Sequence, residues 1–117
     1  MLKVYVYNKC STCQKALTWL AAKKVPFKEI PIRERPPAMS ELKTMLTLYD
    51  GQVRRLFNTS GMDYRAQNLS DKLPGMTTSA ALGLLVKNGN LVKRPFLLAP
   101  DGRGAVGFRE EEWKALL

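Results

Sequence analysis

The 117-residue chain contains no histidine, and this absence limits the chemistry that it can perform. Without an imidazole, neither serine nor cysteine can be activated by the usual histidine base. A structural zinc ion normally takes four cysteine or histidine ligands, and the chain offers only Cys10 and Cys13. We therefore exclude serine–histidine hydrolysis and expect neither a metal nor a cofactor.

Cysteines are few, and long apolar runs are missing. No stretch approaches the roughly 18–20 continuous apolar residues that cross a bilayer, and the first residues have the pattern of a strand instead of a signal segment. Two cysteines are too few for a secreted disulfide scaffold. We expect a cytoplasmic protein with no membrane partner, in which a C-x-x-C pair indicates catalysis, redox sensing or metal binding.

Acidic residues are also scarce, since 10 Asp and Glu face 19 Lys and Arg and the formal net charge is +9. Such an imbalance implies attraction to an anionic partner. The basic residues are spread along the chain, without a long run and without the interleaved aromatic residues of a single-strand binder. We therefore expect a solvated basic surface and no direct binding of nucleic acid.

The residues that are present indicate a β-α-β unit at the start of the chain. Residues 2–7 are rich in β-branched and aromatic types and predict a strand. Residues 11–24 place apolar side chains at helical spacing, at Cys13, Ala16, Leu17, Leu20 and Ala21. Residues 27–32 follow Pro26 as a second, partly exposed strand, and the two strands of such a unit should be parallel.

Helical patterns fill the middle of the chain. A helix over residues 40–49 should bury Leu42, Met45, Leu46 and Tyr49, a short helix follows near residues 53–57, and residues 62–76 form short helical or irregular pieces. Thr77 or Thr78 should cap a further helix that ends at residues 88–90 and buries Ala80, Ala81, Leu84 and Leu85.

The end of the chain predicts a β-hairpin, from residues 96–99 and 105–108, and a helix over 110–117 with Trp113, Leu116 and Leu117 facing inward. The element order is then β-α-β, a helical insertion, and β-β-α. This order predicts an α/β (α+β) thioredoxin-like fold, with a mixed sheet of about four strands flanked by helices. We expect one domain over residues 1–117, with a thioredoxin core in 1–35 and 91–117 and the insertion in about 36–90.

The two cysteines stand where the first helix begins. A cysteine at a helix N-terminus faces unpaired backbone N–H groups and the positive end of the helix dipole, which stabilise a thiolate. Lys9 adds positive charge beside Cys10, while Cys13, one turn later, can attack a mixed disulfide formed at Cys10. The alternative is a pair of ordinary buried thiols that pack the helix.

Arg94-Pro95 is the second candidate feature. In this fold, a proline just before a strand is commonly cis and brings its backbone beside the dithiol. The alternative is an edge-strand proline with a surface arginine.

The chain resembles the arsenate reductase and Spx family of thioredoxin-like proteins over nearly its whole length. The segments that carry the resemblance are 10–16 (with Ser11 and Thr12), Trp19-Leu20, 25–27, 56–61 with Tyr64-Arg65, 93–95, 106–108 and 110–113. Asn8 departs from the family, where proline is frequent at this position.

The resemblance implies that Cys10 is the nucleophile, that Arg94 holds an oxyanion or tunes the thiolate, and that Pro95 is cis. Glutaredoxin-linked arsenate reductases use three arginines around the nucleophile, and the positions of the other two are occupied here by Asn58 and Gly107. Arg54, Arg55 or Arg103 could substitute for them. We include Lys9, Ser11, Thr12, Asn58 and Pro95 as binding residues around the catalytic set of Cys10, Cys13 and Arg94.

Two functions follow from these expectations. The first is a thiol-dependent oxidoreductase with a reversible Cys10–Cys13 disulfide, an oxyanion such as arsenate as a candidate substrate, and thioredoxin or glutaredoxin with glutathione as reductant. The second is an Spx-type redox-sensing regulator that binds the C-terminal domain of the RNA polymerase alpha subunit, for which the resemblance offers Gly51 as a contact. The sequence favours the enzyme slightly, and the retained dithiol argues against an inert relative.

Overall fold

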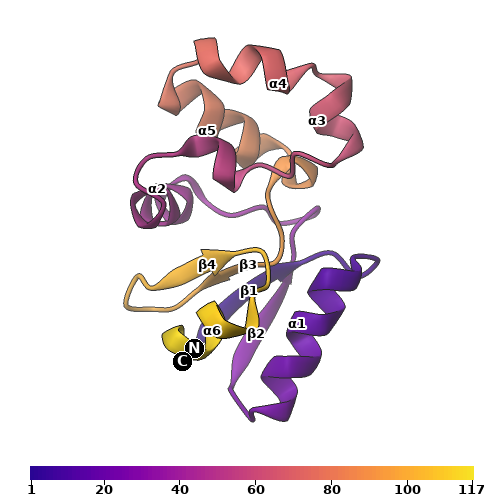
Figure 1. The fold of residues 1–117 in the computed structure, drawn as a ribbon, viewed down its shortest axis with the longest axis vertical. Coiled ribbons are helices and arrows are strands. Elements are labelled where there is room, and N and C mark those ends of the chain that lie inside the picture. Colours follow the sequence, from indigo (N-terminus) through magenta and orange to yellow (C-terminus); the bar gives the residue numbers. More distant parts are fainter.

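A mixed four-stranded sheet, in the order β2-β1-β3-β4, runs through the centre of the computed structural model, which describes all residues 1–117. β1 (Leu2–Val6) pairs in parallel with β2 (Phe27–Pro31) and antiparallel with β3 (Phe96–Leu98). β3 pairs antiparallel with β4 (Gly104–Val106). Helices cover both faces of the sheet, so the predicted α/β thioredoxin-like fold is confirmed (Figure 1).

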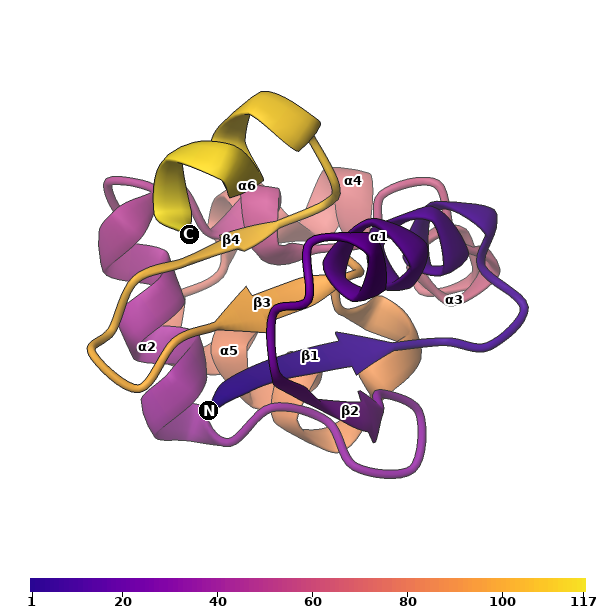
Figure 2. The ribbon, with the colours of Figure 1, turned by 90° about the horizontal axis from the view of Figure 1, so that it is seen from below.

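One face of the sheet is covered by α1 (Ser11–Ala22) and α6 (Glu110–Leu116) (Figure 2). Because side chains alternate along a strand, β1 sends every second residue to this face. The buried residues there are Leu2, Val4, Val6, Cys13, Ala16, Leu20, Leu97, Ala105 and Trp113. Cys13 therefore belongs to the hydrophobic core between the sheet and α1.

The opposite face carries the insertion, which lies above the sheet in Figure 1. Its helices are α2 (Met39–Leu48), α3 (Met62–Ala66), α4 (Leu69–Lys72) and α5 (Thr78–Lys87), with 3-10 turns η1 (Val53–Leu56), η2 (Leu73–Gly75) and η3 (Gly89–Leu91). The sheet contributes Tyr5, Ile30, Phe96 and Leu98 to the core on this side. None of the helices has both the length and the apolar character that crossing a bilayer requires.

One polar anchor joins the insertion to β1, and a side-chain cap begins α5. Glu41, in the first turn of α2, accepts hydrogen bonds from the Tyr5 hydroxyl at 2.6 Å, the Lys3 ammonium at 3.1 Å and the Ala38 backbone N–H at 3.0 Å. Thr77 caps α5, as predicted, by accepting the Ala80 N–H at 3.1 Å. These bonds satisfy backbone donors that a helix N-terminus otherwise leaves free.

The structure corrects several details of the predicted helix faces. Ala21 and Ala80 are exposed, and Leu84 is only half-buried, whereas Leu82 is 1% exposed and was not predicted to be buried. Leu117, predicted to face inward, is 46% exposed because it follows the last turn of α6.

The strands are also shorter than predicted. β1 stops at Val6 because the carbonyl of the next residue, Tyr7, accepts the Cys10 N–H at 3.0 Å and begins the turn into α1. β4 stops at Val106 because Gly107 has a φ of +73°, which a strand cannot continue.

Candidate thiol site and adjoining basic cavity

Cys10 is the N-cap of α1 and is half-buried. Its backbone is extended, with φ −93° and ψ 116°, so the side chain turns back over the first helical turn. The sulfur accepts the Cys13 backbone N–H at 3.4 Å. The sulfur therefore lies at the N-terminus of α1, at the positive end of the helix dipole.

Cys13 lies beside Cys10 but is fully buried. Burial raises the pKa of the Cys13 thiol to about 12, while hydrogen bonding with the Tyr7 backbone and the positive charge of Arg94 partly offset that effect. Cys13 is therefore a protonated thiol at neutral pH. Both cysteines are free, so the site pairs one accessible sulfur with one protected sulfur.

Arg94 and Pro95 lie between the insertion and β3. Their peptide bond is cis, as the resemblance implied. Pro95 is buried, and its carbonyl accepts the Gly107 N–H at 2.9 Å. The Arg94 guanidinium lies 5.1 Å from the centre of the Tyr7 ring, and one of its nitrogens, Nη1, is buried without a hydrogen-bond partner.

Tyr7 connects these groups, and the sequence analysis did not identify it. A second guanidinium, from Arg33, lies 4.9 Å from the centre of the same ring and donates a hydrogen bond to the Tyr7 hydroxyl at 3.0 Å. The backbone of Tyr7 meanwhile interacts with both cysteines. The only signal in the sequence was an aromatic residue three positions before Cys10.

A cavity of about 760 Å³ adjoins the C-x-x-C turn at Thr12. Its basic lining residues come from three separate segments: Arg54 and Arg55, Lys93 and Arg94, and Arg109. Its one acidic lining residue, Glu112, lies 3.8 Å from Arg109 as an ion pair. The cavity is therefore strongly basic, and it lies next to the dithiol.

The predicted site residues do not all meet in this cavity. Thr12 and Arg94 line it, whereas Cys10, Cys13, Lys9, Ser11, Asn58 and Pro95 do not. Lys9 and Ser11 are exposed beside Cys10. Asn58 belongs to a turn, in which its backbone N–H donates to the Leu91 carbonyl at 2.7 Å and its side chain donates to the Asn90 carbonyl at 3.5 Å.

Of the three arginines considered as substitutes, Arg54 and Arg55 line the cavity and Arg103 does not. Arg103 donates to Asp101 at 2.8 Å and to the Leu116 carbonyl at 2.7 Å. Sequence reasoning also missed Lys93 and Arg109 as cavity residues. Their closeness along the chain to Arg94 and Gly107 was the available signal.

Comparisons with known proteins agree with this architecture. The ArsC family model matches residues 5–116. The chain is 42% identical over 114 residues to Bacillus subtilis YusI, described as uncharacterized, covering 97% of this chain and 95% of YusI. It is 31% identical over 118 residues to the global transcriptional regulator Spx of Enterococcus faecalis, covering all of this chain and 86% of Spx.

Two solved structures are similar over almost the full length. An ArsC family related protein from Bacteroides fragilis superimposes with a TM-score of 0.92 at 40% identity, covering 99% of this chain and 97% of the other. A protein from Streptococcus mutans, described as a possible arsenate reductase, gives a TM-score of 0.88 at 37% identity, covering 97% and 98%. This chain belongs to the ArsC family of thioredoxin-like proteins, whose relatives include arsenate reductase-like proteins and Spx regulators.

Proposed function

We propose that the chain is a thiol-dependent oxidoreductase in which Cys10 is the nucleophile and Cys13 the resolving thiol. The observation that carries this proposal is the contrast between the two sulfurs. Cys10 is partly accessible and accepts a backbone N–H, whereas Cys13 is fully buried directly beside it. A thiolate that a substrate can reach and a thiol that it cannot reach suit two successive steps.

In the first step, the Cys10 thiolate attacks one sulfur of a substrate disulfide and expels the other half as a thiolate. In the second step, the Cys13 thiol attacks the mixed disulfide and its proton leaves with the released half. The products are a Cys10–Cys13 disulfide and two reduced substrate thiols, so two electrons pass to the substrate. Thioredoxin, or glutaredoxin with glutathione, then reduces the protein disulfide.

The neighbouring residues support these steps. Arg94 acts with the two cysteines because it places positive charge near Cys13. Lys9, Ser11, Thr12, Asn58 and Pro95 are the proposed binding residues around this set, and among them Thr12 lines the basic cavity. These residues belong to one domain over residues 1–117, with a thioredoxin core in 1–35 and 91–117 and the insertion in about 36–90. We place the protein in the cytoplasm.

Trapping the mixed disulfide tests the assignment of the two cysteines. Cys13→Ser should accumulate a covalent adduct with a small disulfide such as hydroxyethyl disulfide, visible as added mass in intact-protein mass spectrometry. Cys10→Ser should form no adduct and lose turnover with a thioredoxin or glutaredoxin reducing system. Turnover by Cys10→Ser at the wild-type rate would contradict the proposal.

Arsenate is a narrower substrate for the same chemistry. The similarity to the S. mutans protein favours it, but Asn58 and Gly107 stand where arsenate reductases of the family have two of three arginines. Fewer bidentate guanidinium contacts weaken oxyanion binding. Arsenate-dependent turnover of the wild-type protein no faster than that of Cys10→Ser would remove arsenate as a substrate and leave disulfide exchange standing.

The second candidate function is an Spx-type regulator that contacts the C-terminal domain of the RNA polymerase alpha subunit. The similarity to Spx favours it, as does the position of Gly51, which is exposed after α2 with a φ of +77° and open space around its Cα. Binding of the isolated alpha domain by calorimetry, with reduced and oxidised protein, tests this role. Gly51→Asn is a suitable variant because asparagine tolerates a positive φ, and it should weaken binding.

A further inference from the structure

The basic cavity carries more positive charge than the dithiol chemistry requires. Arg54 and Arg55 come from η1 in the insertion, Lys93 and Arg94 from the segment before β3, and Arg109 from the residue before α6. The structure contains three ion pairs, and among these five cations only Arg109 takes part in one. Four cations therefore converge on one concave surface without a carboxylate partner.

Such a group attracts anions. Like charges that share a concave surface repel one another and raise the local concentration of anions. Arg94 adds a second observation, because its Nη1 atom is buried and makes no hydrogen bond. A buried donor without an acceptor costs free energy, which an incoming carboxylate oxygen would recover.

Two of the cavity's arginines rest on tyrosine rings. The cavity is also larger than a single oxyanion requires. The Arg55 guanidinium lies 4.5 Å from the centre of the Tyr49 ring, and Arg94 rests on Tyr7. A volume of about 760 Å³ falls in the range of sites for small organic ligands, about 300–1,000 Å³. Phe57, Val106 and Phe108 add apolar lining for the body of such a ligand.

We propose that this cavity binds a peptide disulfide whose cysteine is flanked by carboxylate side chains. The inference rests on the proposed thiol–disulfide exchange and names its substrate class. Thr12 belongs both to the C-x-x-C turn and to the cavity wall, so a peptide seated there has its disulfide near Cys10. The flanking carboxylates pair with Arg54, Arg55 and Arg94, since guanidinium groups bind carboxylates in two-pronged contacts.

The reaction is the exchange already described, with the acidic peptide as the departing group. Cys10 forms a bond to one peptide sulfur as the peptide S–S bond breaks, and one peptide leaves as a thiolate. Cys13 then forms the protein disulfide as the second peptide leaves as a thiol. The peptide disulfide is reduced and the protein dithiol is oxidised by two electrons.

Two matched peptide disulfides test this preference. The homodimers of acetyl-Glu-Cys-Glu-amide and acetyl-Gln-Cys-Gln-amide carry the same disulfide and differ only in charge. We expect kcat/KM for the Glu peptide to exceed that for the Gln peptide by about tenfold or more at low ionic strength, and the ratio to shrink as salt screens the charges.

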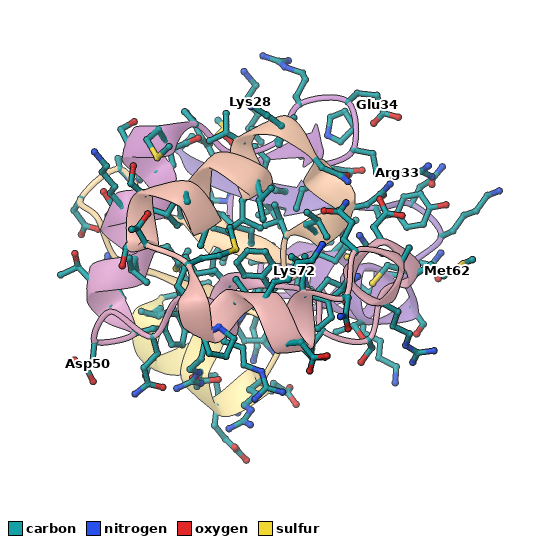
Figure 3. The ribbon with its side chains drawn as sticks, turned by 90° about the horizontal axis from the view of Figure 1, so that it is seen from above. Lys28, Arg33, Glu34, Asp50, Met62 and Lys72 are labelled. Carbon is teal, nitrogen blue, oxygen red and sulfur yellow. The ribbon has the colours of Figure 1, made fainter.

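Variants locate the effect in the cavity. The double variant Arg54→Gln/Arg55→Gln should raise KM for the Glu peptide and bring the ratio of kcat/KM between the Glu and Gln peptides close to one. The matched control is Lys28→Gln/Lys72→Gln, which removes the same total charge at two exposed positions outside the cavity, both labelled in Figure 3. The control should keep the preference for the Glu peptide.

The outcomes separate this inference from the function on which it rests. Equal rates with the two peptides, both lost in Cys10→Ser, would overturn the acidic-peptide inference and leave the oxidoreductase standing. Failure of both peptides to react would overturn the oxidoreductase as well. Inhibition of Glu-peptide exchange by inorganic phosphate at micromolar concentration would overturn the inference in another way, because it would show a site built for a single oxyanion.

Discussion

The two faces of the sheet are covered unequally, and each contributes a different part of the site. The face under α1 and α6 buries a core of 9 residues that includes Cys13, whereas the face under the insertion buries a core of 18 residues without a cysteine. The smaller core thus contains the buried cysteine of the proposed reactive pair. The larger one supports η1, which brings Arg54 and Arg55 to the cavity.

This division shows how a chain with only two cysteines and no histidine places its two sulfurs and its basic cavity side by side. The strand-turn-helix unit positions the sulfurs by backbone geometry alone, through the N-terminus of α1. The insertion contributes the positive charges of Arg54 and Arg55 from the other side of the sheet. The two sulfurs and the charge around them can therefore be altered separately by substitution.

The largest effect should be the protection of Cys13. With a pKa raised to about 12 by burial, its thiolate fraction at pH 7.5 is about three-thousandfold below that of an ordinary cysteine with a pKa near 8.5. In Cys10→Ser, where Cys13 is the only thiol, iodoacetamide should therefore label the folded protein at least about a hundredfold more slowly than the same protein unfolded in guanidinium, since the part of the pKa shift that comes from Cys10 is lost and the part that comes from burial stays. Mass spectrometry measures both rates.

Burial is the main cause of the raised pKa of Cys13, so this result should survive the loss of Cys10. The direction of the pKa shift of Cys13 also sets how the stability of the fold depends on pH. Because the folded-state pKa lies above the unfolded value, this thiol's contribution to stability is complete below about pH 8.5 and is lost as pH rises toward 12. Equal labelling rates in the folded and unfolded states would show that Cys13 is not protected.

The sequence allowed the fold to be predicted because each element has a strong local pattern. Residues 2–7 are rich in β-branched and aromatic types, the helix after Cys10 follows a period of 3.6 residues, and both elements are present. Periodicity was less reliable for helix faces in the insertion. Ala80 was predicted to be buried on α5 and is exposed, and Leu82 was left out of the predicted buried set and is buried, because an apolar helix gives little contrast between its faces.

The site could be predicted only in part, for a related reason. The C-x-x-C turn and Arg94 are local motifs and were identified from the chain alone. The cavity depends on how η1, the segment before β3 and the residue before α6 meet in space, and no local pattern encodes that meeting. Arg109 and Tyr7 were missed for this reason, since their partners lie on other elements.

Two leucines, one in each core, should have equal effects on the free energy of unfolding, and these effects are smaller than the change in the labelling rate of Cys13. Leu20 lies in the core with Cys13, and Leu82 lies in the core of the insertion; they are 0% and 1% exposed. Leu20→Ala and Leu82→Ala should each lower the free energy of unfolding by about 3 kcal/mol in urea titrations followed by circular dichroism.

The same pair should differ in thiol protection. In the Cys10→Ser background, Leu20→Ala opens space beside the helix that carries Cys13 and should speed its labelling by iodoacetamide. Leu82→Ala, on the far side of the sheet, should leave the labelling rate near that of its parent. If both changes speed the labelling of Cys13 equally, the two cores open as one unit and do not protect the thiol independently.

The Glu41 anchor between the insertion and β1 should contribute less. Burial opposes ionisation of this carboxyl, but hydrogen bonds from Tyr5, Ala38 and Lys3 outweigh it and lower the pKa of Glu41. Glu41→Gln should therefore cost about 1–2 kcal/mol at pH 7, in the range of hydrogen bonds to a charged group. Because the folded-state pKa is depressed, this stabilisation is present above about pH 4.3 and is lost as pH falls through the folded value.

Urea unfolding at pH 7 and at pH 3 measures that dependence. The difference in free energy of unfolding between wild type and Glu41→Gln should be smaller at pH 3 than at pH 7. Glu34→Gln is a matched control, since Glu34 is exposed and makes no ion pair (Figure 3). A gap of the same size at both pH values would show that the charge of Glu41 does not stabilise the contact.

The smallest effect should come from Tyr7, which joins the two sides of the sheet. Its ring packs against the insertion's core, while its backbone contacts both cysteines. Tyr7→Leu removes the ring under Arg94, and an exposed cation–π contact is worth about 0.5–1 kcal/mol. We therefore expect disulfide exchange through Cys10 to slow by about two- to fivefold, measured as kcat/KM.

Tyr7→Phe separates the ring from its hydroxyl. Phenylalanine keeps the contact with Arg94 and loses only the hydrogen bond that Arg33 donates to the Tyr7 hydroxyl. Its rate should therefore stay near that of wild type, whereas Tyr7→Leu should resemble Arg94→Gln in direction. If Tyr7→Phe and Tyr7→Leu slow the exchange equally, the Tyr7 hydroxyl and Arg33 position the site. The important contact of Tyr7 is then with the segment after β2 and not with Arg94.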